Sequence, residues 1–204
     1  MEPMIVDESS MPPELDAAIR AGLCACFPKD REHFAAGRDW HGSRPAFSAV
    51  VQEGVSVVAS QTRQTTASGQ TTAPGADSPA QVIAHAGVVD RVIEAGGVPL
   101  RVAGVQNVFV VPARRGTGLV HRVMKAAMAE AARRGLDCGL LFCSPALVKV
   151  YARTGWRPLP PAPITRVDAA GRELPLPAGN VAMFFPLARA DFPPGDIHLR
   201  GNDW

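Results

Sequence analysis

The sequence predicts an α+β domain in which helices flank a mixed β-sheet. Strand-like runs and amphipathic helical segments alternate along the chain, and a glycine-containing loop near its middle joins a strand to a helix. The chain has 204 residues, of which 47% are hydrophobic and 20% are charged. This composition is typical of globular proteins, and the length suits one domain that spans residues 1–204.

The first part of the chain predicts a short strand, a helix and a shorter helix. The strand is expected at residues 4–7, before a proline-containing turn. Residues 14–27 predict a helix, because large apolar side chains recur there at four-residue spacing on one face. Pro28 ends this helix, and a short helix is expected at residues 31–36.

Two β-rich runs, residues 47–52 and 55–59, flank Glu53-Gly54 and predict a hairpin. Residues 60–79 then consist almost entirely of Gln, Thr, Ser, Gly, Ala and Pro. Such a segment cannot bury enough apolar surface to offset the entropy that it would lose on ordering. We therefore expect a mobile insertion between strands, because the β pattern resumes directly after it.

The second half of the chain predicts further strands and two helices. Strand patterns cover residues 81–93, 98–101, 103–111, 138–143 and 180–187, with a glycine turn at 95–97. Helical patterns cover residues 116–134, ended by Gly135, and residues 145–153, ended by Gly155. The tail, residues 193–204, is expected to be irregular.

Charge and cysteine usage argue against several classes of function. The formal net charge is +2, from 21 basic and 19 acidic residues, so bulk electrostatics does not predict nucleic-acid binding. No apolar run reaches the ~20 residues of a membrane helix, and the first residues do not form a secretory leader. The four cysteines form neither a C-x-x-C pair nor a metal cluster. We expect a cytoplasmic protein without a metal, a membrane or a nucleic acid as partner.

The most informative segment is Arg114-Arg115-Gly116-Thr117-Gly118, which joins a strand to a helix. The first N–H groups of that helix have no intrahelical acceptor, and together with the helix dipole they form an anion site. The two glycines would let a phosphate approach the backbone, and the two arginines add charge-assisted donors. The segment is neither a Walker loop nor a G-x-G-x-x-G motif. Taken alone, it fits a turn with a solvated basic pair equally well.

Together with the segment Tyr151-Ala-Arg-Thr-Gly-Trp156, this loop resembles the GCN5-related N-acetyltransferase (GNAT) family. The phosphate motif of that family, Q/R-x-x-G-x-G/A, is filled by Arg115, Gly118 and Val120, although Val120 is larger than the residue expected last. The resemblance implies a mostly antiparallel central sheet whose strands splay apart at an acyl-CoA site. It places these residues against acetyl-CoA: Phe109, Val110, Val111, Arg114, Arg115, Gly116, Thr117, Gly118, Leu119 and Val120.

The resemblance also implies a direct reaction, in which a neutral amine attacks the thioester carbonyl of acetyl-CoA. Tyr151 stands where the family often places the general acid that protonates the departing thiolate. A thiol pKa of about 8.5 lies below a phenol pKa of about 10, so this proton transfer needs a shared hydrogen bond. The alternative for Tyr151 is a helix tyrosine that only packs its ring.

Most of the chain outside residues 60–79 resembles one branch of the family, the aminoglycoside 2′-N-acetyltransferases. The similarity rests on residues 82–89, on Asp39-Trp40 and on the ending Gly201-Asn202-Asp203-Trp204, which is close to their G-D-x-W. From this resemblance the candidate acceptor-binding residues are Asp30, Asp39, Trp40, Gln106, Asn107, Asp203 and Trp204.

Two departures from that branch argue against an aminoglycoside acceptor. Its members carry a glutamate at the position of Gln106, and an amide cannot accept a proton at neutral pH. Their acidic run before the final strand is replaced here by residues 176–179, so the pocket is expected to be less anionic. We therefore expect acetyl transfer to another small-molecule amine. The alternatives are an aminoglycoside acceptor and a non-catalytic protein that binds CoA or a drug.

The base that removes a proton from the acceptor amine is left open by the sequence. Asp39, the carboxylate of Trp204, His85 and His121 are candidates, although each histidine could equally be a packed or solvated residue. An acceptor amine with a low pKa would need little help from a base. Many relatives pair as dimers, so a homodimer is also open.

Overall fold

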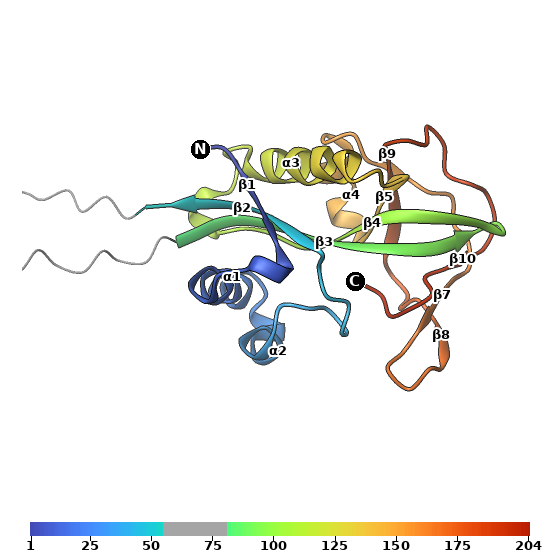
Figure 1. Cartoon of the computed structure of the whole chain (residues 1–204), viewed down its shortest axis with the longest axis horizontal. Coiled ribbons are helices and arrows are strands. Elements are labelled where there is room, and N and C mark those ends of the chain that lie inside the picture. The colour runs from blue at the N-terminus through green and yellow to red at the C-terminus, as the bar shows by residue number, and fades with distance from the viewer. Residues whose placement is uncertain (55–80) are drawn as a thin grey trace, which may run out of the picture.

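The computed structural model describes residues 1–54 and 81–204. In this part of the chain ten strands form one sheet, with β6-β9-β5-β4-β3-β10-β7-β8 as its main path and β2 and β1 added beside β3 (Figure 1). The strands are β1 Met4–Asp7, β2 Phe47–Glu53, β3 Gln81–Ala95, β4 Val98–Val110, β5 Cys138–Cys143, β6 Arg157–Pro158, β7 Ile164–Val167, β8 Glu173–Pro175, β9 Val181–Pro186 and β10 Ile197–His198. The expected strand at residues 55–59 and the expected mobile insertion at 60–79 lie outside the described residues.

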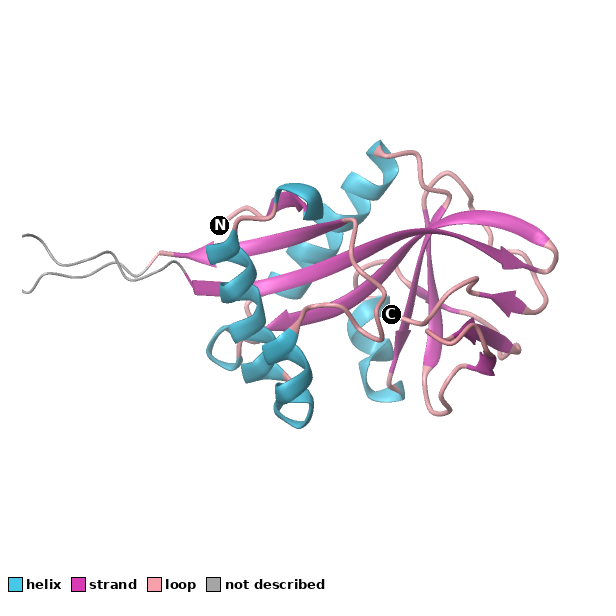
Figure 2. Cartoon of the chain, turned by 60° about the horizontal axis from the view of Figure 1, so that its bottom comes forward, coloured by secondary structure: helices cyan, strands magenta, loops and turns pink. Residues whose placement is uncertain are grey.

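Helices cover both faces of the sheet. The α-helices are α1 Pro13–Cys26, α2 Arg31–Ala36, α3 Leu119–Arg133 and α4 Val148–Ala152, and short 3₁₀ turns lie at Glu8–Ser10, Pro28–Asp30, Pro112–Arg114 and Pro145–Leu147. Helices α1 and α2 pack on one face and α3 packs on the other (Figures 1 and 2). The expected helix at residues 145–153 is thus a 3₁₀ turn followed by α4.

Helix α1 shows how the apolar spacing fixes the packing. Its residues Leu15, Ile19 and Leu23 are buried, as the four-residue spacing predicts. The helix comes very close to β4 at Gly22, where a Cβ atom would lie 2.3 Å from Cζ of Phe109. A larger residue at this position would therefore push α1 away from the sheet.

The long strand β3 organises the sheet. It pairs with β4 along its length, with β2 in its first half and with β10 at its end. The expected strands at 98–101 and 103–111 form one continuous strand, β4. The prediction of an irregular tail was wrong at β10, which pairs with both β3 and β7. Strands of two to four residues, such as β7, β8 and β10, carry too little periodicity to be seen in sequence.

The sheet splays where β4 and β5 part. These parallel strands pair only from Val102–Cys138 to Val105–Leu141, although both strands continue further. Just beyond, the register between β3 and β4 shifts, and Asn107 adopts a left-handed φ of 54°. A bulge of this kind bends its strand, so β4 turns away from β5. The mixed, mostly antiparallel sheet with splayed strands is confirmed.

The start of α3 differs from the expectation. The helix was expected from residue 116 but begins at Leu119. Gly116 and Gly118 have φ values of 77° and 78°, and left-handed residues cannot be part of a right-handed helix. The end is confirmed: Gly135 has φ 71°, and its N–H donates to the carbonyl of Ala132 at 3.0 Å.

Candidate active site

The loop before α3 forms an anion-binding geometry. The first hydrogen bond into the helix runs from the N–H of Arg122 to the carbonyl of Gly118 at 3.2 Å. The N–H groups just ahead of Arg122 therefore lie at the positive end of a helix of 15 residues. A Cβ atom at Gly116 or Gly118 would meet nothing within 4 Å, so both glycines face open space. An anion can reach the backbone here.

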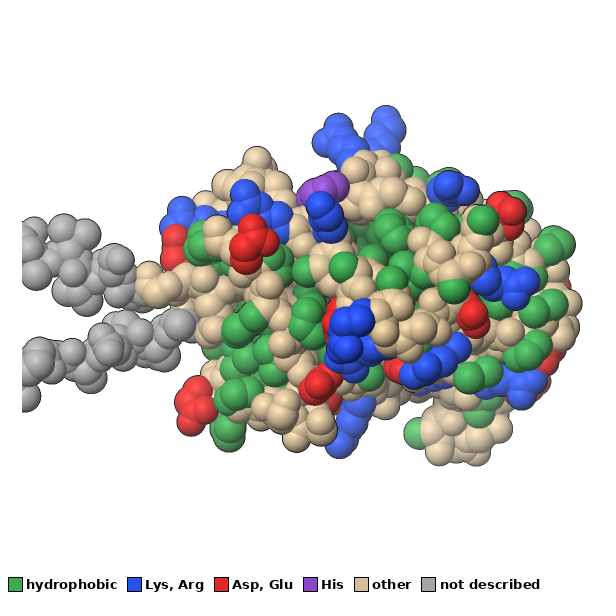
Figure 3. Space-filling view, turned by 45° about the horizontal axis from the view of Figure 1, so that its top comes forward, with side chains coloured by type: hydrophobic (Ala, Val, Ile, Leu, Met, Phe, Trp, Pro, Cys, Tyr) green, Lys and Arg blue, Asp and Glu red, His purple; other side chains and the backbone are tan. Residues whose placement is uncertain are grey.

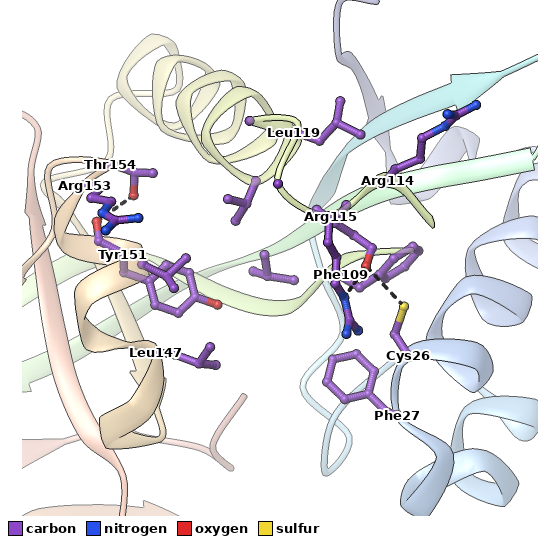
Figure 4. A pocket seen from close by; sticks show the side chains of 16 residues that line it. Cys26, Phe27, Phe109, Arg114, Arg115, Leu119, Leu147, Tyr151, Arg153 and Thr154 are labelled. Carbon is purple, nitrogen blue, oxygen red and sulfur yellow. Dashed lines mark hydrogen bonds between the residues drawn. The ribbon is translucent and has the colours of Figure 1, made fainter. Parts of the chain in front are cut away.

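A cavity of about 720 Å³ opens beside this loop (Figure 4). Its walls come from β4, the loop, the start of α3, the end of α1 and the segment around α4. The lining residues are Cys26, Phe27, Val108, Phe109, Val110, Arg114, Arg115, Gly116, Gly118, Leu119, Val120, Leu147, Val150, Tyr151, Arg153 and Thr154. We call this space the loop cavity.

Two residues expected against acetyl-CoA do not line the loop cavity. Val111 is only 7% exposed and packs in the core. The hydroxyl of Thr117 donates to the carbonyl of Arg114 at 2.6 Å, which braces the turn. These two residues shape the loop, whereas the other eight expected residues face the cavity.

The two arginines of the loop differ in their surroundings. Arg114 forms an ion pair with both carboxylate oxygens of Glu53. Its Nη2 lies 2.6 Å from Oε1 and from Oε2, and its Nε lies 3.0 Å from Oε2. Arg115 has no such carboxylate among its described contacts, and its Nε donates to the carbonyl of Val110 at 3.4 Å. In Figure 4 the side chain of Arg115 extends into the cavity toward Phe27. Arg115 is therefore the better placed of the two to meet a phosphate.

The face that α3 lies on carries many basic side chains. Figure 3 shows Lys and Arg side chains spread across this view, with hydrophobic side chains exposed between them. Arg153, which the sequence reasoning did not single out as a ligand, lines the loop cavity opposite Arg115 (Figure 4). The near-neutral net charge thus coexists with local positive charge around the loop.

Tyr151 lies between two cavities. Its side chain is 8% exposed, and in Figure 4 its hydroxyl points into the loop cavity. Burial raises the pKa of Tyr151 well above its usual value, and the nearby Cys143 adds to the rise. The phenol therefore carries its proton at neutral pH. Trp156, from the same motif, is 2% exposed and belongs to the core.

A second cavity, of about 310 Å³, continues from the first and shares Phe27, Val108, Leu147 and Tyr151 with it. We call it the acceptor cavity. Its other lining residues are Phe34, Trp40, Val105, Gln106, Asn107, Leu141, Phe142, Cys143, Ser144, Asn180, Asp203 and Trp204. The structure thus brings five of the seven expected acceptor residues together: Trp40, Gln106, Asn107, Asp203 and Trp204.

The other two expected acceptor residues do not line this cavity. Asp39 lines a separate cleft of about 490 Å³, together with Arg38 and Arg44. Asp30 ends the 3₁₀ turn after α1 and lines neither the loop cavity nor the acceptor cavity.

Gln106 is 4% exposed and is held at both ends of its amide. Its Oε1 accepts a hydrogen bond from the N–H of Trp40 at 3.2 Å, and its Nε2 donates to the carbonyl of Ser43 at 2.6 Å. The neighbouring Asn107 donates from its side-chain amide to the carbonyl of Arg38. These two amides fasten the loop before β2 onto β4.

Asp203 is the carboxylate that lines the acceptor cavity, and it is 5% exposed. Its Oδ1 accepts from Nδ1 of His41 at 2.9 Å and lies 3.3 Å from Nη1 of Arg166. Because a carboxylate can only accept, neutral His41 carries its proton on Nδ1 and its lone pair on Nε2. The His41 side chain is 42% exposed, and nothing in the sequence drew attention to it.

The two histidines expected as candidate bases are poorly placed. His85 is completely buried, with Nδ1 donating to the carbonyl of Asn107 at 2.8 Å and Nε2 3.1 Å from the hydroxyl of Ser48. Burial, together with a smaller effect of the nearby Arg38, lowers the pKa of His85 to about 4. His121 is exposed on α3 and lines neither cavity.

Sequence reasoning missed part of the cavity walls. Three apolar side chains enter the site only because their elements pack beside β4. They are Phe27 directly after α1, Phe34 in α2 and Leu147 in the turn before α4. Ser144 and Asn180 border the gap between the splayed strands. The apolar spacing of residues 14–27 marks Phe27 as a core residue, and no signal in the sequence distinguishes it as a site residue.

Within residues 1–54 and 81–204, no three His, Cys, Asp or Glu side chains gather in a way that could hold a metal ion. In the same residues no helix is long and apolar enough to cross a membrane.

Comparisons with known proteins identify the family of this chain and support its fold. Residues 23–159 match the family model described as an acetyltransferase (GNAT) domain. The GNAT family N-acetyltransferase YhbS from Escherichia coli, solved with CoA, is 16% identical, with a TM-score of 0.56 over 98% of this chain and 91% of that chain. A GNAT family acetyltransferase from Brucella melitensis, solved with acetyl-CoA, is 19% identical, with a TM-score of 0.53 over 96% and 94%.

A third similar solved structure is that of an enzyme named for a protein substrate. The ribosomal-protein-S18-alanine N-acetyltransferase from Escherichia coli is 17% identical, with a TM-score of 0.51 over 93% of this chain and 96% of that chain. At these identities the likeness shows the fold alone. A comparison with curated proteins found no match.

Proposed function

Because this chain belongs to the GNAT acetyltransferase family, we propose that it transfers an acetyl group from acetyl-CoA to the primary amine of a small molecule. The observation that carries the proposal is the meeting of two cavities at Tyr151. One cavity has the anion-binding start of α3, and the other is closed by aromatic and amide side chains. A donor and an acceptor could therefore approach the same hydroxyl from opposite sides.

The loop cavity suits acetyl-CoA. The start of α3 offers backbone N–H groups and the dipole to a pyrophosphate, and Arg115 and Arg153 add charge-assisted donors. The unpaired edge of β4 beyond Val105 offers backbone groups to the pantetheine arm. Two of the similar solved structures hold CoA or acetyl-CoA, which supports this assignment.

The proposed reaction is a direct transfer. The amine nitrogen bonds to the thioester carbonyl carbon, the carbon–sulfur bond breaks, and the sulfur takes a proton from Tyr151. Burial raises the pKa of Tyr151, so the phenol carries its proton at neutral pH. Because a thiol is the stronger acid, the transfer requires a direct hydrogen bond from the Tyr151 hydroxyl to the departing sulfur. The amine must lose one proton overall, and an amine with a low pKa arrives with its lone pair already free.

His41 and Asp203 offer a route for that proton. Asp203 lines the acceptor cavity, and its hydrogen bond leaves the Nε2 lone pair of neutral His41 directed away from the carboxylate. His41 itself lines neither cavity, so the acceptor meets this pair through Asp203. Gln106 cannot accept the proton, which leaves this pair as the proposed route.

An aminoglycoside is the second candidate acceptor, because Trp40, Asp203 and Trp204 do line the acceptor cavity.

Release of free CoA thiol, followed with a chromogenic disulfide, tests the proposal on a panel of amines. Acetyl-CoA-dependent thiol release with an amine supports acetyl transfer. Acetyl-CoA binding without thiol release on any amine would instead support a non-catalytic CoA-binding protein.

A further inference from the structure

The side chains that line the acceptor cavity restrict which amines can bind there. We propose, as an inference that rests on the proposed function, that the acceptor is a small primary amine that carries an aromatic ring and at most one positive charge.

Aromatic rings surround the cavity from several elements. Phe27 ends α1, Trp40 lies in the loop before β2, and Phe142 comes from β5, and all three are partly exposed to the cavity. Trp40 stacks on the buried ring of Phe34, with centroids 5.3 Å apart and an angle of 24° between planes. Phe34 therefore holds the Trp40 ring in place, and rigid aromatic faces favour a flat apolar ligand.

The charge in the cavity does not suit a polycation. Among the described side chains that line the cavity, only that of Asp203 is charged, and it already faces His41 and Arg166. Arg166 is itself only 18% exposed, so its charge stays close to the carboxylate. An ammonium group that enters this cavity gives up its hydration, and beyond Asp203 no lining side chain carries a negative charge to compensate for that loss.

Neutral polar groups can still orient one amine. Ser144 and Asn180 are exposed residues that line the cavity, and Tyr151 lines it too. The hydroxyl and amide oxygens of these side chains can accept hydrogen bonds from an amine, and neutral acceptors do not require it to be charged. The cavity thus combines a few neutral polar contacts with aromatic walls.

The size of the cavity also favours a small molecule. Its volume of about 310 Å³ is near the lower end of the range for small-ligand sites, about 300–1,000 Å³. A compact aromatic amine can fill such a space, whereas a multi-ring aminoglycoside would leave most of its rings and charges outside.

The test compares 2-phenylethylamine, spermidine and tobramycin as acceptors at saturating acetyl-CoA. We expect kcat/KM for 2-phenylethylamine to exceed that of both polycations by about tenfold or more, equivalent to about 1.4 kcal/mol. Preference for spermidine or tobramycin would overturn the inference while leaving acetyl transfer intact. If no amine releases thiol, calorimetric titration of 2-phenylethylamine and spermidine into the CoA-bound protein decides the binding preference separately from the proposed function.

Two variants test the walls themselves. Trp40→Leu keeps an apolar side chain but removes the ring, so KM for 2-phenylethylamine should rise about tenfold while the Kd for acetyl-CoA stays unchanged. Asn180→Asp adds a carboxylate at an exposed position, so spermidine should gain relative to 2-phenylethylamine, and Asn180→Ala is the matched control. The Tm of each variant shows that it folds. An unchanged KM in Trp40→Leu would contradict the proposed role of the ring.

Discussion

The side chain of Gln106 ties the loop that carries Trp40 to strand β4. Its Oε1 accepts from the N–H of Trp40 at 3.2 Å, while its Nε2 donates to the carbonyl of Ser43 at 2.6 Å. One amide therefore serves a donor and an acceptor at once, which a carboxylate cannot do. Gln106, which replaces the glutamate expected as a base, therefore holds the loop that carries Trp40 against β4.

Replacing Gln106 with glutamate should therefore destabilise the protein rather than restore a base. A carboxylate oxygen would face the carbonyl of Ser43, so we expect a loss of about 1–3 kcal/mol in the free energy of unfolding. Urea denaturation at neutral pH measures this loss. Gln52→Glu makes the same change at a partly exposed position of β2, opposite Val82, and should stay within about 0.5 kcal/mol of the parent. Higher turnover in Gln106→Glu would argue against a fastening role.

Arg115 and Arg114 should contribute unequally to acetyl-CoA binding. Arg115 extends into the loop cavity, whereas Arg114 is engaged by Glu53. Loss of charge-assisted hydrogen bonds worth about 1.5–3 kcal/mol should weaken acetyl-CoA binding by roughly 10- to 100-fold in Arg115→Ala. Arg114→Ala should change the Kd by less than about threefold. Calorimetric titration compares the two, and equal effects would contradict this difference.

Tyr151→Phe should lower kcat with little change in acetyl-CoA affinity. The variant keeps the buried ring and removes only the hydroxyl that faces the cavity. Loss of a general acid typically costs about 10²- to 10⁴-fold in rate. Steady-state thiol release gives kcat, and titration gives the Kd. A variant with unchanged turnover would restrict Tyr151 to packing.

His85 should make stability depend on pH in the mildly acidic range. Its pKa is about 4 in the folded protein because it is buried, against an ordinary value of 6.5. Its contribution is fully present above about pH 6.5 and is lost as pH falls toward about 4, because the unfolded chain then binds the proton more readily. The full difference amounts to about 3 kcal/mol at 1.36 kcal/mol per pKa unit.

The variant His85→Gln isolates this contribution. Glutamine can donate to the carbonyl of Asn107, as His85 does, but it does not titrate. We expect the parent to lose more stability than His85→Gln in urea denaturation between about pH 6.5 and pH 4.5. Equal losses would show that His85 does not titrate in this way.

Features that depend on short stretches of chain could be predicted from sequence. The start of α3 follows a loop whose glycines adopt left-handed conformations, and this local requirement is visible as Arg115-Gly116-Thr117-Gly118. The apolar spacing of α1 likewise reports its buried face directly. The exact first residue of α3 was missed because a glycine pattern does not show which residues take a positive φ.

Features that depend on contacts between distant segments could not be predicted. The role of Gln106 arises only when the loop before β2 lies across β4, and no sequence pattern reports that contact. Asp39 and Trp40 are adjacent, yet they line different cavities. Phe34 enters the site through its stacking on Trp40, which requires α2 to be folded back beside the sheet.

The most direct test of acetyl-CoA binding at the start of α3 is a calorimetric titration of the parent, Gly118→Ala and Gly171→Ala. Both glycines have left-handed φ values, 78° and 76°, and open space around them, but Gly171 lies in the turn between β7 and β8. Each substitution should cost about 1–2 kcal/mol of stability. We expect the parent to bind, Gly171→Ala to bind equally well and Gly118→Ala to bind about tenfold more weakly. A parent that does not bind acetyl-CoA, or two variants that bind alike, would contradict the account.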